Sequence, residues 1–334
     1  MSQLPIVVLT NATFPETRAL FDGIALVVAN DKPEPWPESV LHAHCRGASG
    51  IMAFMTDRID AGLLDVCPRL RVIGAALKGY DNIDVAAASE RGVWVTICED
   101  LLTVPTAELA IGLMLSLGRH MVRADRDIRF AGFRGWRPSY YGTGLDGASV
   151  GIVGFGKVGQ AIADRLLCFG CRIAAFDASA AGFPDRFAGR IARRGLTEVV
   201  ADSDFVVLAL PLTAATMHII DARVLAAMKT GALLVNPARG SLVNEQAVAG
   251  ALASGHLGGY AADVFECEDW ARPDRPAIID PGLCASEAST VLTPHIGSAV
   301  TSVRRQIEAS AANSIIDVLS GRRPAGAINA PAAR

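Results

Sequence analysis

The sequence predicts an α/β protein with two Rossmann-like or flavodoxin-like domains, each built on a parallel sheet. Short apolar runs rich in β-branched residues alternate with helical patterns, as in βα units. The alternation occurs in two successive series, so we expect two sheets. The predicted strands of the first series are residues 6–9, 24–28, 51–55, 72–75 and 93–96, and those of the second are residues 149–153, 173–176, 205–208, 233–235, 260–264 and 291–293.

Two helical patterns indicate how the predicted domains are connected. Residues 105–132 lie between the two series, with Pro105 in the first turn and no proline further on, so we expect one long connecting helix. An amphipathic pattern at residues 300–319 follows the second series and has no sheet of its own to cover. We expect this helix to return to the first domain. The predicted first domain is therefore discontinuous, residues 1–102 and 297–334, and the second is residues 103–296, with the active site in the cleft.

The charge balance argues against nucleic acid and membranes as partners. The 334 residues include 31 basic and 34 acidic ones, a net charge of −3, so the chain has no general attraction for polyanions. Arg119, Arg123, Arg126 and Arg129 share one predicted helix face, which we interpret as a solvated or subunit-facing surface. The sequence shows neither a signal peptide nor an apolar run long enough to cross a bilayer.

The seven cysteines do not form the dense framework of a secreted scaffold, so we expect a cytoplasmic protein. Cys168 and Cys171 form a C-x-x-C pair, but no second pair or nearby histidine completes a metal set. We interpret this pair as structural, and we interpret His42 and His44 in the same way. The sequence therefore predicts no metal site.

A glycine fingerprint predicts a dinucleotide site in the second domain. Gly154-Phe155-Gly156-Lys157-Val158-Gly159 follows an apolar strand and opens a helix, which is the context that makes the pattern specific. Gly154 permits the tight turn, Gly156 lets the backbone approach a pyrophosphate, and Gly159 allows close packing of helix on strand. The helix N-terminus supplies unpaired N–H groups for the anion.

Asp177 indicates NAD rather than NADP as the cofactor. It comes 18 residues after Gly159, at the end of the next predicted strand. A carboxylate there accepts hydrogen bonds from the ribose hydroxyls and repels a 2′-phosphate. Ala178 and Ser179 follow, so no arginine comes directly after it to reverse this preference. We therefore expect an NAD-binding Rossmann domain at residues 103–296 and a substrate (catalytic) domain in the rest of the chain.

Three further motifs follow predicted strands of the second series, where ligands bind in open α/β sheets. They are residues 236–241, 262–268 and 293–298. Together with the glycine fingerprint and residues 78–84, they make nearly the whole chain resemble the D-isomer-specific 2-hydroxyacid dehydrogenase family. The resemblance implies that Arg239 binds the substrate anion and that Glu268 and His295 handle the proton. The residue types suit these roles. The planar guanidinium of arginine can donate hydrogen bonds to two oxygens, and a carboxylate beside a histidine fixes which ring nitrogen carries the proton.

The resemblance also implies further cofactor contacts and an assembly. A symmetric homodimer through the region of the Pro105 helix is what the family implies. The additional cofactor-binding residues implied are Thr106, Leu210, Pro211, Ala238, Asp263 and Gly297.

Several segments resemble the phosphite (phosphonate) dehydrogenases within this family. They are residues 52–55, 76–80, 100–108, 135–136, 141–145 and 268–272. Most hydroxyacid dehydrogenases carry a small or neutral residue where Lys78 stands. Phosphite is a small tetrahedral anion, and Lys78 adds a second, compact positive charge to that of the Arg239 guanidinium. The substrate-binding residues implied are Lys78, Gly79, Met55, Trp136, Tyr141, Trp270 and Ser298.

The expected reaction is oxidation of phosphite to phosphate, with hydride transfer to NAD and water as the nucleophile. A 2-hydroxyacid dehydrogenase that reduces a small 2-oxo acid would need Arg239, Glu268 and His295 but not Lys78. A third alternative is an NAD(H)-sensing binding protein, as in the corepressors of the same fold. One departure from the family is Asn244, where an aspartate is usual, and its lost charge is expected to affect the setting of Arg239.

Overall fold

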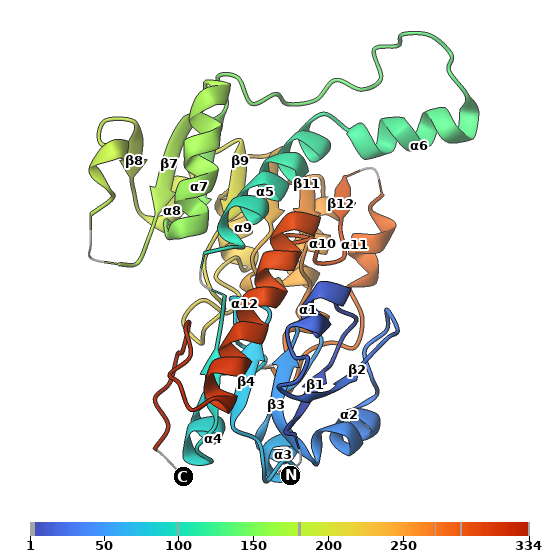
Figure 1. The fold of residues 1–334 in the computed structure, drawn as a ribbon. Helices are drawn as coiled ribbons and strands as arrows, with labels where there is room; N and C mark the ends of the chain where they lie inside the picture. The colour runs from blue at the N-terminus through green and yellow to red at the C-terminus, as the bar shows by residue number, and fades with distance from the viewer. Residues whose placement is uncertain (1–3, 99, 180–181, 271, 288, 333–334) are drawn as a thin grey trace. The chain divides into compact units, whose positions relative to one another are not determined.

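The computed structural model describes residues 4–98, 100–179, 182–270, 272–287 and 289–332. The chain forms two compact units (Figure 1), which are unit 1, residues 1–102 and 299–334, and unit 2, residues 103–298. The chain re-enters unit 1 at Ala299, two residues after the boundary expected from the sequence. Both units are parallel α/β structures, as the sequence predicts.

Unit 1 is built on a five-stranded parallel sheet in the order β2-β1-β3-β4-β5, which is flavodoxin-like. This order places the carboxyl ends of β1 and β3 side by side, so polar residues that follow these strands can meet. Two clusters of buried apolar side chains cover the two faces of the sheet. Its elements are β1 (Ile6–Leu9), α1 (Pro15–Ala19), β2 (Leu26–Ala29), α2 (Glu38–Cys45), β3 (Ala48–Ala53), α3 (Ala61–Asp65), β4 (Val72–Ala75), α4 (Val85–Glu90), β5 (Trp94–Thr96) and α12 (Thr301–Leu319).

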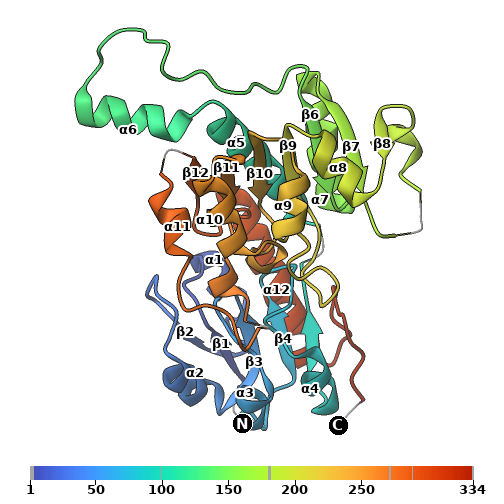
Figure 2. The same cartoon turned by 180° about the vertical axis from the view of Figure 1, so that it is seen from behind.

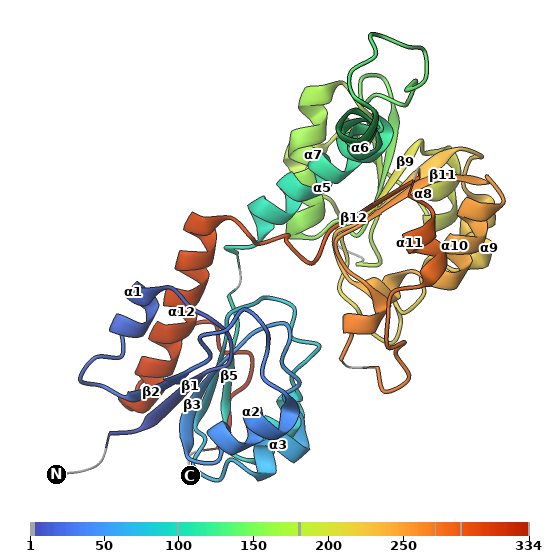
Figure 3. The same cartoon turned by 90° about the vertical axis from the view of Figure 1, so that its right-hand side faces the viewer.

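Helix α12 belongs to unit 1 and packs along β3 and β4 (Figure 3). Small residues make this close approach possible. A Cβ added to Gly74 would lie 2.7 Å from the carbonyl oxygen of Ala311, and one added to Gly50 would lie 2.8 Å from Ile315. The final helix therefore returns to the first sheet, as expected from its lack of a sheet of its own.

Unit 2 contains a seven-stranded parallel sheet in the order β12-β11-β10-β9-β6-β7-β8. The order reverses between β6 and β9, which is the switch point where a Rossmann sheet binds its dinucleotide. The sequence did not indicate β8, because this strand has only three residues and two of them are exposed. The strands are β6 (Ser149–Val153), β7 (Arg172–Phe176), β8 (Ile191–Arg193), β9 (Phe205–Leu208), β10 (Ala232–Asn236), β11 (Leu257–Ala262) and β12 (Thr290–Leu292).

Helices cover both faces of this sheet (Figure 2). Helices α5 (Thr103–Gly118) and α7 (Lys157–Leu166) pack on one face, where they bury one apolar cluster. Helices α8 (Leu196–Asp202), α9 (Ala222–Ala227) and α10 (Glu245–Ala253) pack on the other, over a second cluster. A short helix, α11 (Pro281–Ala285), packs against α10.

The single connecting helix expected over residues 105–132 is wrong, because the structure has two helices there. Helix α5 ends at Gly118, and α6 (Met121–Ala131) begins after His120, whose backbone is left-handed with φ 53°. A left-handed residue cannot continue an α-helix, so the chain changes direction. Helix α5 is buried in unit 2, and among the residues described no helix is long and apolar enough to cross a bilayer.

Candidate active site

The glycine fingerprint forms the turn between β6 and α7. Gly154 has φ +98°, and a Cβ there would lie 2.5 Å from the carbonyl oxygen of Ala209. A Cβ on Gly159 would lie 2.1 Å from the carbonyl oxygen of Gly154, so the helix touches the strand here. A Cβ on Gly156 would meet nothing within 4 Å. This open space, in front of the first turn of α7, fits a pyrophosphate that approaches the backbone.

Asp177 follows β7 and lies against the fingerprint. Its Oδ2 accepts a hydrogen bond from the Phe155 N–H at 2.7 Å, and its Oδ1 accepts one from the Ser179 N–H at 2.8 Å. Arg193, at the end of β8, donates to the carbonyl oxygens of Asp177 and Ser179. The sequence reasoning considered only the residues directly after Asp177. It therefore missed this cation, which is 16 residues further along the chain.

The Asp177→Asn variant is expected to use NADP better relative to NAD than the wild type does. Asparagine keeps an acceptor for the Phe155 N–H but removes the charge that repels a 2′-phosphate, and Arg193 remains nearby. We expect the ratio of kcat/KM for NADP to kcat/KM for NAD to rise by about tenfold or more. Steady-state kinetics with both cofactors measures this ratio. Asp202→Asn, at an exposed carboxylate of the same unit, is the control, and an equal ratio in both variants would contradict the role of Asp177.

Arg239 lies in the loop after β10, and Asn236 at the end of that strand holds the loop. The Asn236 side chain donates to the Arg239 carbonyl oxygen at 2.7 Å and accepts from the Ala238 N–H at 3.1 Å. Asn236 is fully buried, so the backbone on the N-terminal side of Arg239 is fixed. The half-buried guanidinium donates from Nη1 to the Ala238 carbonyl oxygen at 2.8 Å.

Gly240 brings the Arg239 loop against the loop that carries Glu268. A Cβ on Gly240 would lie 1.9 Å from the carbonyl carbon of Phe265, so the two backbones are in direct contact and only glycine fits. The two loops form 3-10 turns, Gly240–Leu242 and Glu266–Glu268. Arg239 and Glu268 are therefore carried by neighbouring, close-packed turns.

Glu268 and His295 form a hydrogen-bonded pair. His295 Nδ1 lies 2.8 Å from Glu268 Oε2, and Glu268 Oε1 accepts from the Phe265 N–H at 2.8 Å. Because Nδ1 is engaged by a carboxylate, the tautomer is fixed and Nε2 is left for the substrate. His295 has a left-handed backbone with φ 54°, a conformation that costs energy in a non-glycine residue. A partly exposed Glu–His pair in this conformation is suited to proton transfer.

Asp263 holds the turn that carries His295. Its Oδ1 accepts from the Thr293 hydroxyl at 2.6 Å and from the Ile296 N–H at 2.8 Å, and its Oδ2 accepts from the Gly297 N–H at 2.7 Å. Burial raises the pKa of the Asp263 carboxyl, while these hydrogen bonds lower it. The sequence indicated Asp263 as a cofactor contact, and the structure shows that its carboxylate also organises the histidine turn.

The residues predicted in unit 1 follow β3 and β4. Met55, Lys78 and Gly79 are all half-buried. Asn82 joins the two loops, because its side chain donates to the carbonyl oxygens of Phe54 at 3.0 Å and Asp57 at 2.7 Å. The sequence did not single out Asn82, although it lies within the motif of residues 78–84.

Asp57 fixes the turn that contains Met55. Its buried carboxyl accepts from the Phe54 N–H at 2.7 Å and is hydrogen-bonded to the Thr10 hydroxyl. Burial raises the pKa of Asp57 to about 6, although both hydrogen bonds lower it. No sequence motif marks Asp57, because its partner Thr10 is 47 residues away.

Asp57→Asn is expected to change how stability depends on pH. A carboxyl whose pKa is raised on folding binds its proton more tightly in the folded state, so its contribution to stability is present at low pH and lost as pH rises from about 4 to about 6. Asparagine can keep both hydrogen bonds and does not titrate. Relative to the wild type, the variant should gain about 2 kcal/mol of unfolding free energy between pH 4 and pH 7. Urea unfolding at several pH values tests this, and a difference that is constant with pH would contradict it.

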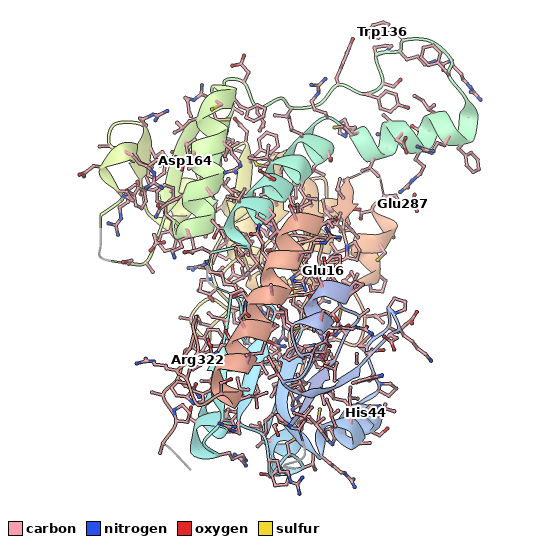
Figure 4. The ribbon with its side chains drawn as sticks, viewed as in Figure 1. Glu16, His44, Trp136, Asp164, Glu287 and Arg322 are labelled. Atoms are coloured by element: carbon pink, nitrogen blue, oxygen red, sulfur yellow. The ribbon has the colours of Figure 1, made fainter. Side chains whose placement is uncertain are left out.

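Trp136 and Tyr141 do not line a site within a single chain. They lie on the segment after α6, which together with α6 forms an extended arm (Figures 1 and 4). Trp136 is 80% exposed and Tyr141 is 75% exposed, and α6 has no buried residue. The resemblance implies that both residues bind the substrate, but in the single chain both side chains are largely exposed and neither is enclosed by a pocket.

The other predicted contacts of unit 2 are distributed over several loops. Ser298 is buried next to Gly297, and a Cβ on Gly297 would lie 3.5 Å from the Thr106 hydroxyl, so these three residues are close together. Leu210 and Pro211 follow β9, at the switch point of the sheet. Trp270 is half-buried, with the guanidinium of Arg275 4.0 Å above its ring.

Asn244 has a local structural role. Its side chain accepts from the Ala247 N–H at 2.9 Å and caps the N-terminus of α10. Asparagine and aspartate stabilise a helix about equally well when they cap its N-terminus. The expected disturbance of Arg239 is therefore not seen, because the side chain faces the helix.

The glycine fingerprint and the β6–β9 switch point agree with the family to which this part of the chain is similar. Residues 111–297 match the family described as D-isomer specific 2-hydroxyacid dehydrogenase, NAD binding domain. The chain belongs to the D-isomer specific 2-hydroxyacid dehydrogenase family, and unit 2 is its NAD-binding domain.

Similar proteins span the whole chain. A glyoxylate reductase of Pyrococcus furiosus is 35% identical over 325 residues, which cover 94% of each chain. The structure of the TT0316 protein of Thermus thermophilus is 33% identical with a TM-score of 0.87, covering 97% of this chain and 100% of that one. An NADPH-dependent glyoxylate/hydroxypyruvate reductase of Sinorhizobium meliloti, in complex with NADP and malonate, is 26% identical with a TM-score of 0.82, covering 97% of this chain and 96% of that one.

Proposed function

We propose that this protein is an NAD-dependent dehydrogenase of a small anion, in which Arg239 binds the anion and His295 exchanges a proton with it. The observation that carries the proposal is the 2.8 Å contact between His295 Nδ1 and Glu268 Oε2. Because Nδ1 is engaged by the carboxylate, Nε2 is the atom of His295 that would exchange the proton. Asp263 holds the turn that carries this histidine, since it accepts hydrogen bonds from the Ile296 and Gly297 N–H groups. A protein that only senses NAD(H) has no need of this pair, so its presence favours an enzyme.

The similar proteins favour a 2-oxo acid as the substrate. The Pyrococcus furiosus and Sinorhizobium meliloti relatives are named as glyoxylate or glyoxylate/hydroxypyruvate reductases. In that reaction Arg239 would bind the carboxylate, and His295 would donate the proton that the new hydroxyl requires. On the names of relatives alone, reduction of glyoxylate or a similar acid is the better supported assignment.

Phosphite is the substrate that we propose, on a different observation. Lys78 and the segment of residues 268–272 resemble the phosphite dehydrogenases, and the glyoxylate assignment gives Lys78 no role. A dianion is better neutralised by an arginine and a lysine than by an arginine alone. Identity near 35% leaves room for such a difference at the few positions that contact the substrate.

The reaction balances without a further reagent. The P–H bond of phosphite would break and a P–O bond to water would form, and NAD bound at the glycine fingerprint would supply the hydride acceptor. His295, supported by Glu268, removes the proton of the attacking water. Arg239 would stabilise the charge on the phosphorus oxygens. The products are phosphate and NADH.

Two assays on the purified protein separate the two substrates. One follows NADH formation from NAD and phosphite, and the other follows NADH loss with glyoxylate, pyruvate or hydroxypyruvate. We expect a kcat/KM for phosphite that exceeds the value for each 2-oxo acid. Turnover of the 2-oxo acids alone would refute phosphite and leave the dehydrogenase proposal standing. Turnover of neither class would refute both.

We also propose that the chain forms a homodimer through the arm. The support is the exposure of large apolar side chains along it, which water solvates poorly. These are Met121, Val122, Ile128, Phe130, Phe133, Trp136 and Tyr141. Light scattering should give about twice the chain mass of 35.0 kDa.

A further inference from the structure

A buried polar cluster lies beside the Arg239 loop and has no part in the proposed chemistry. Its centre is Ser241, which is fully buried and lies two residues after Arg239. All three polar groups of Ser241 are hydrogen-bonded. Its N–H donates to Asp269 Oδ2 at 2.6 Å, its hydroxyl accepts from Arg272 Nη1 at 3.0 Å, and its carbonyl oxygen accepts from the His218 N–H at 2.7 Å. We call Ser241, Asp269, Arg272 and His218 the Ser241 clamp.

The clamp joins the loop of the anion-binding arginine to the loop of the catalytic pair. Asp269 directly follows Glu268, and the Arg272 N–H donates to the Asp269 carbonyl oxygen at 2.9 Å. Asn236 holds the backbone at Ala238 and Arg239, and the clamp holds Ser241 further along on the C-terminal side. Gly240, between the two, is pressed against the Phe265 backbone. With both sides held, the backbone of Arg239 has one position relative to Glu268.

Arg272 is the centre of charge in the clamp. It is 8% exposed, and its Nη1 also donates to Glu266 Oε2 at 3.1 Å, while Nε and Nη2 both contact Asp274 at 3.3 Å. Glu266 Oε1 lies 2.8 Å from His218 Nε2. A planar guanidinium can satisfy these partners together with the Ser241 hydroxyl, and a lysine ammonium cannot.

We propose that Asp269 and Arg272 are positioning residues that fix the guanidinium of Arg239 relative to the Glu268–His295 pair. The inference rests on the proposed function, because it takes Arg239 as the anion site. Neither residue needs to touch the substrate. Their effect on turnover is exerted through the backbone of residues 239–241.

Two mild variants test the positioning role without emptying the cluster. Ser241→Ala removes one hydroxyl. Arg272→Lys keeps the positive charge but loses the planar guanidinium that donates to several partners at once. Arg272→Ala is avoided, because it would leave Glu266 buried without a partner charge and could unfold the protein. Lys229→Gln is the control, since it breaks a 2.8 Å pair with Asp204 elsewhere in unit 2.

We expect Arg272→Lys to lower kcat/KM for the anion about 10- to 100-fold, which is the cost of displacing a catalytic group by about 1 Å. The KM for NAD should stay within about twofold of the wild type, because the fingerprint is untouched. Ser241→Ala should show the same pattern with a smaller loss, and Lys229→Gln should show neither. Equal losses toward the anion and NAD would overturn the proposal.

A double-mutant cycle with Arg239→Lys separates positioning from general damage. If Arg272 acts through Arg239, its substitution should cost little once Arg239 is gone, so the two losses should not add. Additive losses would mean that Arg272 acts by some other route, and the proposal would be wrong.

Oxalate binding distinguishes failure of this inference from failure of the proposed function. Calorimetry with NAD-loaded protein measures the affinity for this anion without turnover. We expect Arg272→Lys to raise the Kd of oxalate about tenfold, even if the wild type turns over neither phosphite nor glyoxylate. An unchanged Kd, or a wild type that does not bind oxalate, would overturn the inference.

Discussion

Replacing His295 with alanine is expected to lower kcat at least about 100-fold, because the substitution removes the group that exchanges a proton with the substrate. The pair with Glu268 holds His295 Nδ1 at 2.8 Å, so Nε2 alone can serve this role. The Kd of NAD should change little, since the fingerprint lies on other loops. Stopped-flow and steady-state kinetics with the substrate that proves active measure the loss.

His256→Ala is the matched control for this prediction. His256 belongs to the same unit and its Nε2 contacts the Leu225 carbonyl oxygen at 2.9 Å. It directly precedes β11, at the opposite end of that strand from the turn that carries Glu268. Its loss should leave kcat unchanged. A His295→Ala variant that keeps wild-type kcat would remove this residue from the mechanism.

Replacing Arg239 with lysine is expected to raise the KM of the anionic substrate about 100-fold or more. The substitution keeps the positive charge but loses the planar fork, so at least one charge-assisted hydrogen bond is lost. Such bonds contribute about 1.5–3 kcal/mol each. The Asn236 and Ser241 contacts are made by the backbone of the loop and should survive the change.

Arg194→Lys provides the comparison for Arg239, because this exposed arginine pairs with Asp202 in the same unit. It should leave every kinetic constant unchanged. If Arg239→Lys raised the KM for NAD as much as the KM for the anion, Arg239 would not be the specific anion site.

The sequence predicted best those features whose partners lie close along the chain. Gly154 and Gly159 are five residues apart. The positive φ of Gly154 and the contact of Gly159 with the Gly154 carbonyl oxygen both arise within one strand–turn–helix unit, so the pattern of the two glycines predicts that unit. The final helix was assigned to the first sheet because its apolar face had no other partner. The two parallel sheets followed from the same alternation of elements.

The features that the sequence did not predict depend on distant contacts. Asp269 holds Ser241 across 28 residues, and Asp263 holds Gly297 across 34. No spacing rule connects such positions before the chain is folded. The break at His120 was missed for another reason, since a left-handed backbone is uncommon for a non-glycine residue, although Gly118 lies two residues before it.

The identification of Arg239, Glu268 and His295 came from resemblance, and the structure added how they are held. Each lies on a turn fixed by a buried polar side chain from elsewhere, Asn236 or Asp263, or by a neighbouring backbone N–H.

Deuterium-labelled phosphite tests the central claim most directly. Purified protein is mixed with NAD and phosphite that carries deuterium on phosphorus, and the NADH formed is analysed by mass spectrometry. Direct transfer of hydride from phosphorus predicts one deuterium in each molecule of NADH formed and an equal amount of phosphate. NADH without the label, or no NADH from phosphite under conditions where glyoxylate is reduced, would contradict the account.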